Sequence, residues 1–405
     1  MIAKNRRVRL LAACLAAVCL LSAAAQAAES SVVIGTGIPG RPEAEVPAQW
    51  DDAWFASSAS IYRQELALTS MALSGAAYLQ KDGESCAQDA LRAFGFQKTQ
   101  SHHYWISTEA GSRAAYTFGM KKVKDQQSKP AWLVAVVVRG TGEYTEWASN
   151  LNVGTGTVHE GFARACGELL VNLKKYLAEI PKKERGSVRF LITGHSRGGA
   201  VANLLAARLP AEGLAEKNHV YGYTFAAPAV STEGTAEGYE NIFNIINTED
   251  LVTQVPLSVW GYRRYGADLP LPAGNSGDQA CQELFDSMNQ RYRELTGEEY
   301  AAYRNPEAVT EITGALYRLV PSASGANMAM ISALLSGDFE GLSALVKENG
   351  PAALLMGKTA MEASSRLTPL LQQEQNGLRS AHCMAGYYSW LEASSGYLQG
   401  SLHSD

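Results

Sequence analysis

The chain has 405 residues, of which 46% are hydrophobic and 19% charged, with 35 basic and 40 acidic side chains. This composition can bury a large core and excludes an intrinsically disordered chain. The formal net charge is −5 and no long run of Lys and Arg occurs, so nothing indicates a nucleic-acid partner.

The first 27 residues predict a cleavable signal peptide. Four basic residues open the chain, an apolar run covers residues 10–25, and Ala25-Gln26-Ala27 has the small-x-small pattern of a cleavage site. The run is too short and too Ala-rich for a membrane span. A lipoprotein-like box at residues 11–14 precedes most of the apolar run. We therefore expect export to the periplasm or medium without a lipid anchor.

Four cysteines remain after the leader: Cys86, Cys166, Cys281 and Cys383. An even number in an oxidising compartment predicts one or two disulfides, and the sequence leaves their pairing open. None has the Cys-x-x-Cys spacing typical of zinc ligands, and we expect neither a metal nor a cofactor.

Residues 28–57 predict an extended, mobile lead-in. Residues 35–40 match the G-x-G-x-x-G pattern of dinucleotide sites after a short apolar run. In those sites the motif opens a helix, but Pro39, Pro42 and Pro47 would break such a helix in its first turns. The match therefore predicts no nucleotide site.

From residue 58 onward, helices alternate with apolar strands. Helices are expected over 58–79, 161–178 and 196–209, and strands over 114–120, 131–138, 188–193, 220–226 and 241–247. Nearly continuous apolar runs such as 131–138 are typical of strands buried on both faces of a parallel sheet. The alternation predicts an α/β sheet with right-handed crossovers, within one domain over 58–405.

The pattern changes to helices alone after about residue 270. Asn305 and Pro306 suit a helix start, and further helical stretches cover 326–335, 340–348 and 351–371. The block from about 270 to 375 is predicted to be a helical insertion or cap on the α/β body.

Gly194-His195-Ser196-Arg197-Gly198 fits the G-x-S-x-G nucleophile elbow. The pattern alone is weak, but here a buried strand runs into it and a helix runs out. Glycines on both sides let strand and helix approach closely, which exposes the Ser196 hydroxyl at a helix N-terminus. The context predicts a nucleophilic serine.

A serine nucleophile needs a base, and the base needs a carboxylate, in the chain order Ser, acid, His for this fold. Asp250 follows the strand at 241–247, with Glu249 as the adjacent alternative. His382 is the preferred base, because the other candidate, His403, lies in the polar C-terminus. For the developing oxyanion we expect the backbone N–H groups of Arg197 and Thr141 as donors.

These motifs together resemble the class 3 lipases. The segments that carry the resemblance are Arg139-Gly140-Thr141, Val158-His159-Glu160-Gly161-Phe162, the elbow, Tyr223-Thr224-Phe225-Ala226-Ala227-Pro228, Asn247-x-x-Asp250-x-Val252 and His382-x-Met384-x-x-Tyr387. The resemblance implies an α/β-hydrolase fold, a mostly parallel sheet flanked by helices. The helical block after about residue 270 is then an insertion in that fold, between the acid and the His. It implies Ser196, Asp250 and His382 as the triad and Thr141 and Arg197 as the oxyanion hole. The long interval between Asp250 and His382 departs from the family pattern.

The expected activity is that of an exported hydrolase of lipid carboxylic esters, which contacts lipid surfaces transiently. Phospholipase or feruloyl/acetyl esterase activity on the same triad is the alternative, since a fold does not fix its substrate. A catalytically silent binding protein on this scaffold is the alternative from another class.

A lid is common in this family, but the interval 142–157 is short and polar. The helical block holds four methionines, Met328, Met330, Met356 and Met361, whose flexible side chains suit a wall around an acyl chain. Simple packing between helices explains them equally well.

Overall fold

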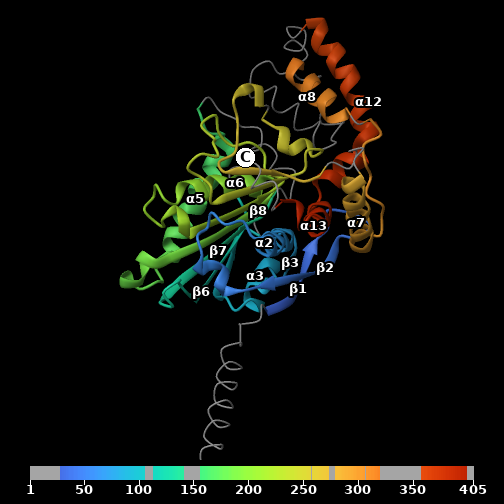
Figure 1. Cartoon of the computed structure of the whole chain (residues 1–405). Coiled ribbons are helices and arrows are strands. Elements are labelled where there is room, and N and C mark those ends of the chain that lie inside the picture. Colours follow the sequence, from blue (N-terminus) through green and yellow to red (C-terminus); the bar gives the residue numbers. More distant parts are fainter. Residues whose placement is uncertain are drawn as a thin grey trace, which may run out of the picture.

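The computed structural model describes residues 28–104, 113–140, 156–256, 258–272, 279–305, 307–319 and 357–398. Its centre is a seven-stranded sheet in the order β11-β10-β9-β8-β7-β6-β5 (Figure 1). The strands are β5 (Gln97–His102), β6 (Tyr116–Lys124), β7 (Pro130–Val138), β8 (Val188–His195), β9 (Val220–Phe225), β10 (Ile242–Ile246) and β11 (Ala267–Pro270). The run from β7 to β11 is parallel and β5 and β6 are antiparallel, which confirms the mostly parallel sheet. The predicted signal peptide lies outside the described residues.

Helices cover both faces of this sheet. On one face lie α5 (Glu160–Leu177) and α6 (Arg197–Arg208); on the other lie α2 (Gln64–Ala76), α3 (Cys86–Ala93) and α13 (Met384–Ala393). Successive side chains of β7 divide between the two cores: Leu133, Ala135 and Val137 face α2, and Val134, Val136 and Val138 face α5 and α6. Burial on both faces explains the unbroken apolar run.

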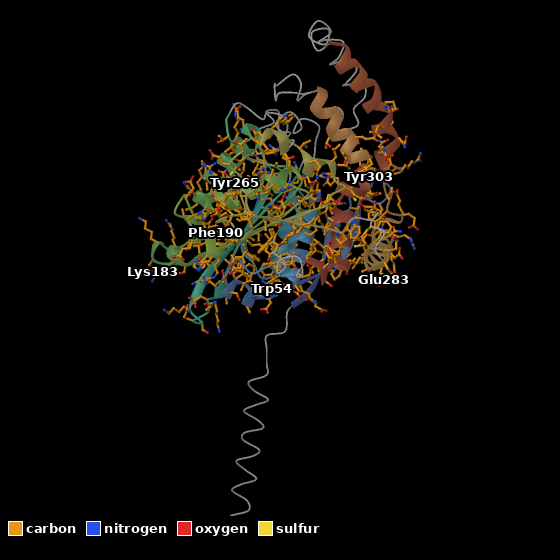
Figure 2. The ribbon with its side chains drawn as sticks, turned by 45° about the horizontal axis from the view of Figure 1, so that its top comes forward. Trp54, Lys183, Phe190, Tyr265, Glu283 and Tyr303 are labelled. Carbon is orange, nitrogen blue, oxygen red and sulfur yellow. The ribbon has the colours of Figure 1, made fainter. Side chains whose placement is uncertain are left out.

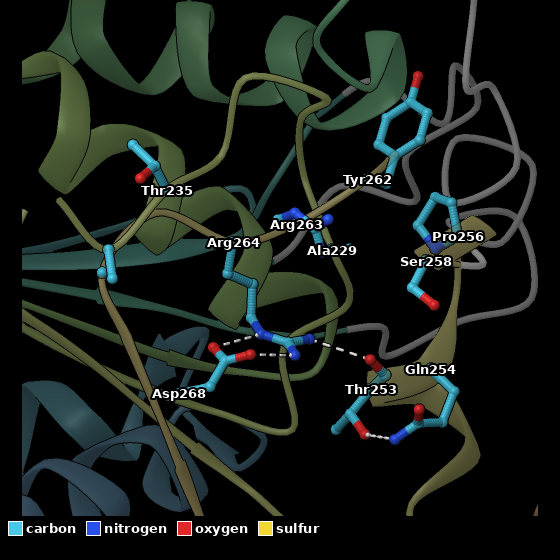
Figure 3. Close-up of a pocket in the computed structure, with 12 residues that line it drawn as sticks. Ala229, Thr235, Thr253, Gln254, Pro256, Ser258, Tyr262, Arg263, Arg264 and Asp268 are labelled. Atoms are coloured by element: carbon cyan, nitrogen blue, oxygen red, sulfur yellow. Dashed lines mark hydrogen bonds and ion pairs between the residues drawn. The ribbon is translucent and has the colours of Figure 1, made fainter. Parts of the chain in front are cut away.

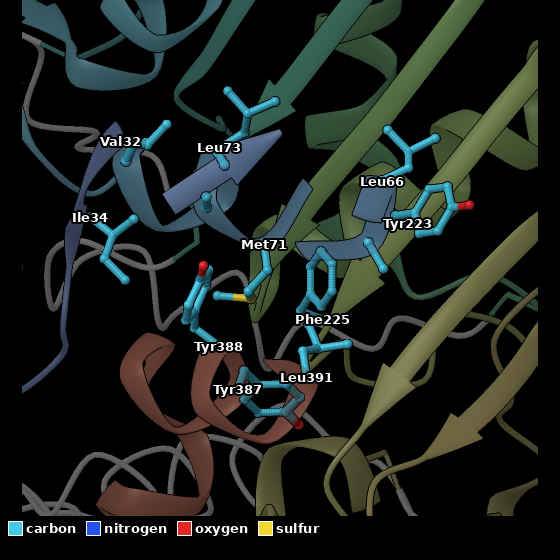
Figure 4. Close-up of a cluster of buried hydrophobic side chains, with 14 of the residues drawn as sticks. Val32, Ile34, Leu66, Met71, Leu73, Tyr223, Phe225, Tyr387, Tyr388 and Leu391 are labelled. Carbon is cyan, nitrogen blue, oxygen red and sulfur yellow. The ribbon is translucent and has the colours of Figure 1, made fainter. Parts of the chain in front are cut away.

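The segment expected to be a mobile lead-in is a packed β-hairpin. Strands β1 (Ala28–Gly35) and β2 (Glu43–Trp50) pair antiparallel, with Val32 opposite Val46. Every second residue of β2 is buried, and Val32 and Ile34 enter the core beside α2 and α13 (Figure 4). This period-two alternation is the signal that the sequence analysis missed. After these glycines the chain continues into β2 and not into a helix.

The helical block contains α7 (Gln279–Thr296), α8 (Ala308–Leu319) and α12 (Gly357–His382). Tyr303 lies beside α8 and α12 (Figure 2), its ring close to Gly377 of α12. The buried carboxylate of Glu374 in α12 accepts hydrogen bonds from the backbone N–H groups of Arg304 (2.8 Å) and Asn305 (3.1 Å). The stretches expected at 326–335 and 340–348 lie outside the described residues, as do Met328, Met330 and Met356.

Short elements complete the described chain. They are β3 (Gln80–Lys81), β4 (Glu84–Ser85), and the 3₁₀ turns η1 (Asp52–Ala56), η2 (Lys182–Ser187), η3 (Lys217–His219), η4 (Leu251–Gln254) and η5 (Ser258–Trp260). Within the described ranges, none of the helices is both long enough and apolar enough to span a membrane.

The expected disulfides are not formed. Cys86, Cys166, Cys281 and Cys383 are all free thiols. Cys166 lies in the core under α5 and Cys383 in the core on the opposite face, so the sheet separates these two. An even cysteine count permits bridges, but the fold decides which thiols meet.

Candidate active site

Ser196 occupies a sharp turn between β8 and α6. Its backbone has φ 58° and ψ −132°, a conformation that costs a non-glycine residue of order 1–3 kcal/mol. The Ser196 N–H donates to the Phe225 carbonyl at the end of the neighbouring strand β9 (2.9 Å), which helps hold the turn. The side chain is therefore presented at the carboxyl end of the sheet, at the N-terminus of α6 and only 7% exposed.

Glycines around this turn are required by backbone-to-backbone packing. A Cβ on Gly194 would lie 2.8 Å from the Val138 carbonyl oxygen, and one on Gly198 would lie 2.6 Å from the Arg139 carbonyl carbon. A Cβ on Gly140 would lie 2.6 Å from the His195 carbonyl oxygen. The end of β7 is thus pressed directly against the serine turn. Thr141, the next residue, lies outside the described residues.

The structure brings together the three side chains that the sequence analysis selected. His382 Nε2 lies 3.0 Å from Ser196 Oγ, and His382 Nδ1 lies 2.8 Å from Asp250 Oδ2. Asp250 is fully buried at the end of β10, whereas 27% of the His382 side chain is exposed. The three groups form one continuous hydrogen-bonded row, although 132 residues separate Asp250 from His382.

The sequence leaves two alternatives open, Glu249 as the acid and His403 as the base. His382 bonds to Asp250 and not to the adjacent Glu249. The backbone carbonyl of Glu249 accepts a hydrogen bond from the Tyr303 hydroxyl (2.5 Å). Burial raises the pKa of the Glu249 carboxyl. His403 lies outside the described residues.

The Asp250 carboxylate has two further partners. Oδ1 accepts from the Val252 N–H (2.9 Å), and Oδ2 accepts from the Tyr387 hydroxyl (2.9 Å). The Tyr387 oxygen in turn accepts the Asn247 N–H (3.0 Å). Tyr387 thereby ties α13 to the loop that carries Asp250, and it fixes the carboxylate that faces His382.

Arg264 stabilises the loop that carries Asp250 by hydrogen bonding (Figure 3). Its guanidinium donates to the carbonyls of Thr253 (3.0 Å) and Ala227 (2.8 Å) and forms an ion pair with Asp268 (2.6 Å). Arg264, Thr253 and Asp268 line a pocket at the β11 edge of the sheet. Across the loop, the Asn247 side-chain amide donates to the Ala381 carbonyl (3.2 Å). Both strand ends and α12 therefore restrain Asp250.

A second histidine, His195, adjoins the site without a hydrogen bond to Ser196 Oγ. His195 is buried between the Tyr78 hydroxyl, 2.9 Å from Nδ1, and the His382 carbonyl, 2.9 Å from Nε2. Burial, reinforced by the nearby His382, lowers the pKa of His195 well below its ordinary value. His159 stacks on Phe162 at the start of α5 (ring centroids 3.8 Å apart). His195 is thus a structural neighbour of the site.

Arg197 is the first residue of α6. The backbone N–H groups in the first turn of a helix have no acceptor within that helix, so the Arg197 N–H points to acceptors outside it. The Arg197 side chain is buried. Within the described part of the chain, no three His, Cys, Asp or Glu side chains are grouped to hold a metal ion.

The sequence does not predict a role for several residues that surround Ser196, His382 and Asp250. Tyr387 lay in a quoted motif but received no role there. Tyr78 and Tyr303 carried no signal, because each reaches the site from a segment remote in sequence and contacts it through one hydroxyl. Arg264 is only 11 residues from Thr253, but no motif marks it.

Residues 133–260 match the model of the lipase (class 3) family. Over this region the chain is similar to the class 3 lipases. The match confirms the resemblance, and the sheet with helices on both faces is the α/β-hydrolase fold that the family implies. His382, in contrast, lies beyond the matched residues.

Two curated relatives are lipases. The secreted mono- and diacylglycerol lipase 1 of Fusarium solani is 31% identical over 154 residues, which cover 35% of this chain and 44% of that protein. Lipase ZK262.3 of Caenorhabditis elegans is 31% identical over 99 residues, 23% of this chain and 26% of that one. The chain thus spans less than half the length of these relatives. A solved triacylglycerol lipase with a serine protease triad is 22% identical, with a TM-score of 0.38, over 53% of this chain and 83% of the other.

Proposed function

We propose that this class 3 lipase relative is a serine hydrolase that cleaves carboxylic ester bonds of lipids, with Ser196, His382 and Asp250 as its triad. The observation that carries the proposal is the row of two hydrogen bonds, 3.0 Å and 2.8 Å long, that ends on a serine with φ 58°. A strained serine between strand and helix, backed by an oriented imidazole, is what acyl transfer needs.

In the proposed reaction, His382 Nε2 takes the proton of Ser196 as Oγ attacks the ester carbonyl carbon. The tetrahedral intermediate collapses, His382 returns the proton to the leaving alcohol, and the acyl group stays on Ser196. A water molecule, deprotonated by His382, then releases the fatty acid. Asp250 keeps the Nδ1–H tautomer of His382 and stabilises the imidazolium that forms in each step.

The oxyanion that develops needs donors in place before the reaction. We assign the Arg197 N–H, at the first turn of α6, and the Thr141 N–H. The close contact of Gly140 with the His195 carbonyl supports this assignment, because it holds the end of β7 beside the serine turn.

The proposed lipid substrate rests on the family and its relatives, and the proposed export rests on the sequence of the leader. The family and both curated relatives are lipases, which supports acylglycerols as substrates. The basic and apolar leader supports export before the enzyme meets lipid surfaces. The helical block at about 270–375 is proposed to wall the acyl-chain site, because α12, which starts in this block, continues beyond it and ends at His382.

The test is covalent labelling of the mature protein by a fluorophosphonate probe, with Ser196→Ala as the matched control. We expect one label on Ser196 in the wild type and none in the variant, in the presence of EDTA. An unlabelled, folded wild type would refute the enzyme and leave the silent binding protein. Labelled protein would then be tested on mono-, di- and triacylglycerols, phospholipids, and feruloyl and acetyl esters, which separates the lipase from its alternatives.

A further inference from the structure

We propose that Tyr78 and His195 are positioning residues that fix the backbone carbonyl of His382 and thereby aim its imidazole at Ser196. The inference rests on the proposed function, since it assigns a role toward the same base. It concerns two side chains that touch none of the reacting atoms.

Three segments meet at His195. It is the last residue of β8, directly before Ser196, while Tyr78 follows the end of α2 and His382 ends α12. The Tyr78 hydroxyl lies 2.9 Å from His195 Nδ1, and His195 Nε2 lies 2.9 Å from the His382 carbonyl oxygen. The Tyr78 and Tyr387 rings both meet the imidazole edge-to-face, at 5.7 Å and 5.6 Å between centroids. His195 therefore has little freedom to turn.

The protons of this row can be assigned by elimination. Burial lowers the pKa of His195, so the imidazole is neutral and carries one proton. The His382 carbonyl can only accept, so that proton sits on Nε2. Nδ1 is then an acceptor, and the Tyr78 O–H donates to it. Tyr78 thus selects the tautomer of His195 that can bind the His382 carbonyl.

Fixing this carbonyl matters because His382 lies at a helix end. The chain turns at Cys383 into α13, so the peptide after His382 lies at the junction of two helices. The bond from His195 holds that peptide plane, and with it the Cα–Cβ direction of His382. The imidazole must stay within hydrogen-bond reach of Ser196 and Asp250 together, and small misplacements of such groups cost rate steeply.

Two substitutions of His195 separate positioning from filling space. The amide nitrogen of Gln reaches the place of Nε2, so His195→Gln keeps a donor for the His382 carbonyl. The amide of Asn reaches only the place of Nδ1, so His195→Asn loses that donor. Both variants lose the ring, and each serves as the control for the other.

The experiment measures kcat and KM on a soluble ester and the rate of fluorophosphonate labelling of Ser196. We expect His195→Asn to lower kcat and the labelling rate about tenfold or more with KM unchanged, because one buried hydrogen bond to the base is lost. His195→Gln should stay within about threefold of the wild type. Equal losses in Asn and Gln, or no loss in either, would overturn the inference.

Tyr78→Phe keeps the inference testable should His195→Asn fail to fold. It frees the tautomer of His195 and is expected to lower kcat about three- to tenfold at unchanged KM. Tyr176→Phe is the control, since its hydroxyl bonds to the Lys98 carbonyl at the far side of the sheet. An unchanged kcat in Tyr78→Phe would overturn the inference. A wild type that takes no label would instead refute the proposed function.

Discussion

The proposed nucleophile, Ser196, and the proposed base, His382, are held in two different ways. Ser196 is set by a contiguous stretch, β8, the turn and α6, in which glycine contacts and one backbone hydrogen bond fix the conformation. His382 is set by segments from across the chain. The Ala385 N–H donates to the Thr36 carbonyl in the hairpin (3.1 Å), and His195 and Asn247 bind the carbonyls of His382 and Ala381.

This difference indicates which kind of substitution should damage each region. The serine turn has no room for an added atom, so it should fail abruptly on a small steric change. The base is held by several separate polar contacts, so removing any one should weaken it by a graded amount. The predictions below test this contrast, beginning with the reacting groups themselves.

The largest effect is expected from the proposed triad. Ser196→Ala and His382→Ala should each lower kcat by several orders of magnitude, on the order of 10⁴ or more, and Asp250→Asn somewhat less. Purified variants assayed on a soluble ester at equal folded concentration give these ratios. An active His382→Ala, together with an inactive His403→Ala, would show that the base was chosen wrongly.

The serine turn is expected to be broken by one methyl group. Gly198→Ala would place a Cβ 2.6 Å from the Arg139 carbonyl carbon, and backbone cannot yield as a side chain can. We expect a loss of about 1–3 kcal/mol in the free energy of unfolding and about a hundredfold loss of kcat. Gly167→Ala on α5 is the matched control, because open space surrounds it and alanine favours the helix. Equal activity in both variants would contradict the contrast.

The base region should respond by degrees. Tyr387→Phe removes the hydroxyl that bridges Asp250 and the Asn247 N–H, and a hydrogen bond to a carboxylate contributes about 1.5–3 kcal/mol. We expect kcat/KM to fall about tenfold to a hundredfold. Tyr388→Phe is the neighbouring control, since its hydroxyl bonds to the Pro47 carbonyl in the hairpin (2.7 Å). That variant should lose some stability and keep its activity within about twofold; equal losses would count against a special role for Tyr387.

The same contrast explains what the sequence could predict. The elbow, its flanking strand and helix, and the buried strands are local patterns, and all of them occur in the structure. Asp250 and His382 could be selected because the chain order of the three groups is fixed in this fold. The selection did not depend on knowing how the intervening helices pack.

What the sequence could not predict is the support of His382. From the sequence alone the segment of β1 and β2 is expected to be mobile, because its alternation is short. Its burial comes from packing against α2 and α13, which the sequence does not reveal. Likewise, nothing about Tyr78 alone indicates that its hydroxyl meets His195, 117 residues away. Contacts of this kind exist only once the tertiary structure has formed.

The smallest expected effect on activity concerns two buried thiols, Cys166 in α5 and Cys383 next to His382. Burial raises the pKa of each thiol from 9.0 to about 11. The folded state therefore binds these protons more tightly than the unfolded state. Their contribution to stability is complete below pH 9 and is lost as the pH rises from 9 toward 11.

At pH 8 both thiols should be protonated and covered, so a thiol-specific aromatic disulfide reagent should spare them and leave activity unchanged. Cys86 and Cys281 are partly exposed and should react. In denaturant without reductant all four thiols of the mature chain should react, and a smaller number would reveal a disulfide. If Cys383 reacted in the folded protein and activity fell with it, the packing around His382 would open readily. The Cys383 thiol accepts the Gly386 N–H (3.3 Å) at the start of α13. Its reaction would therefore show that the chain next to His382 opens more easily than its hydrogen bonds indicate.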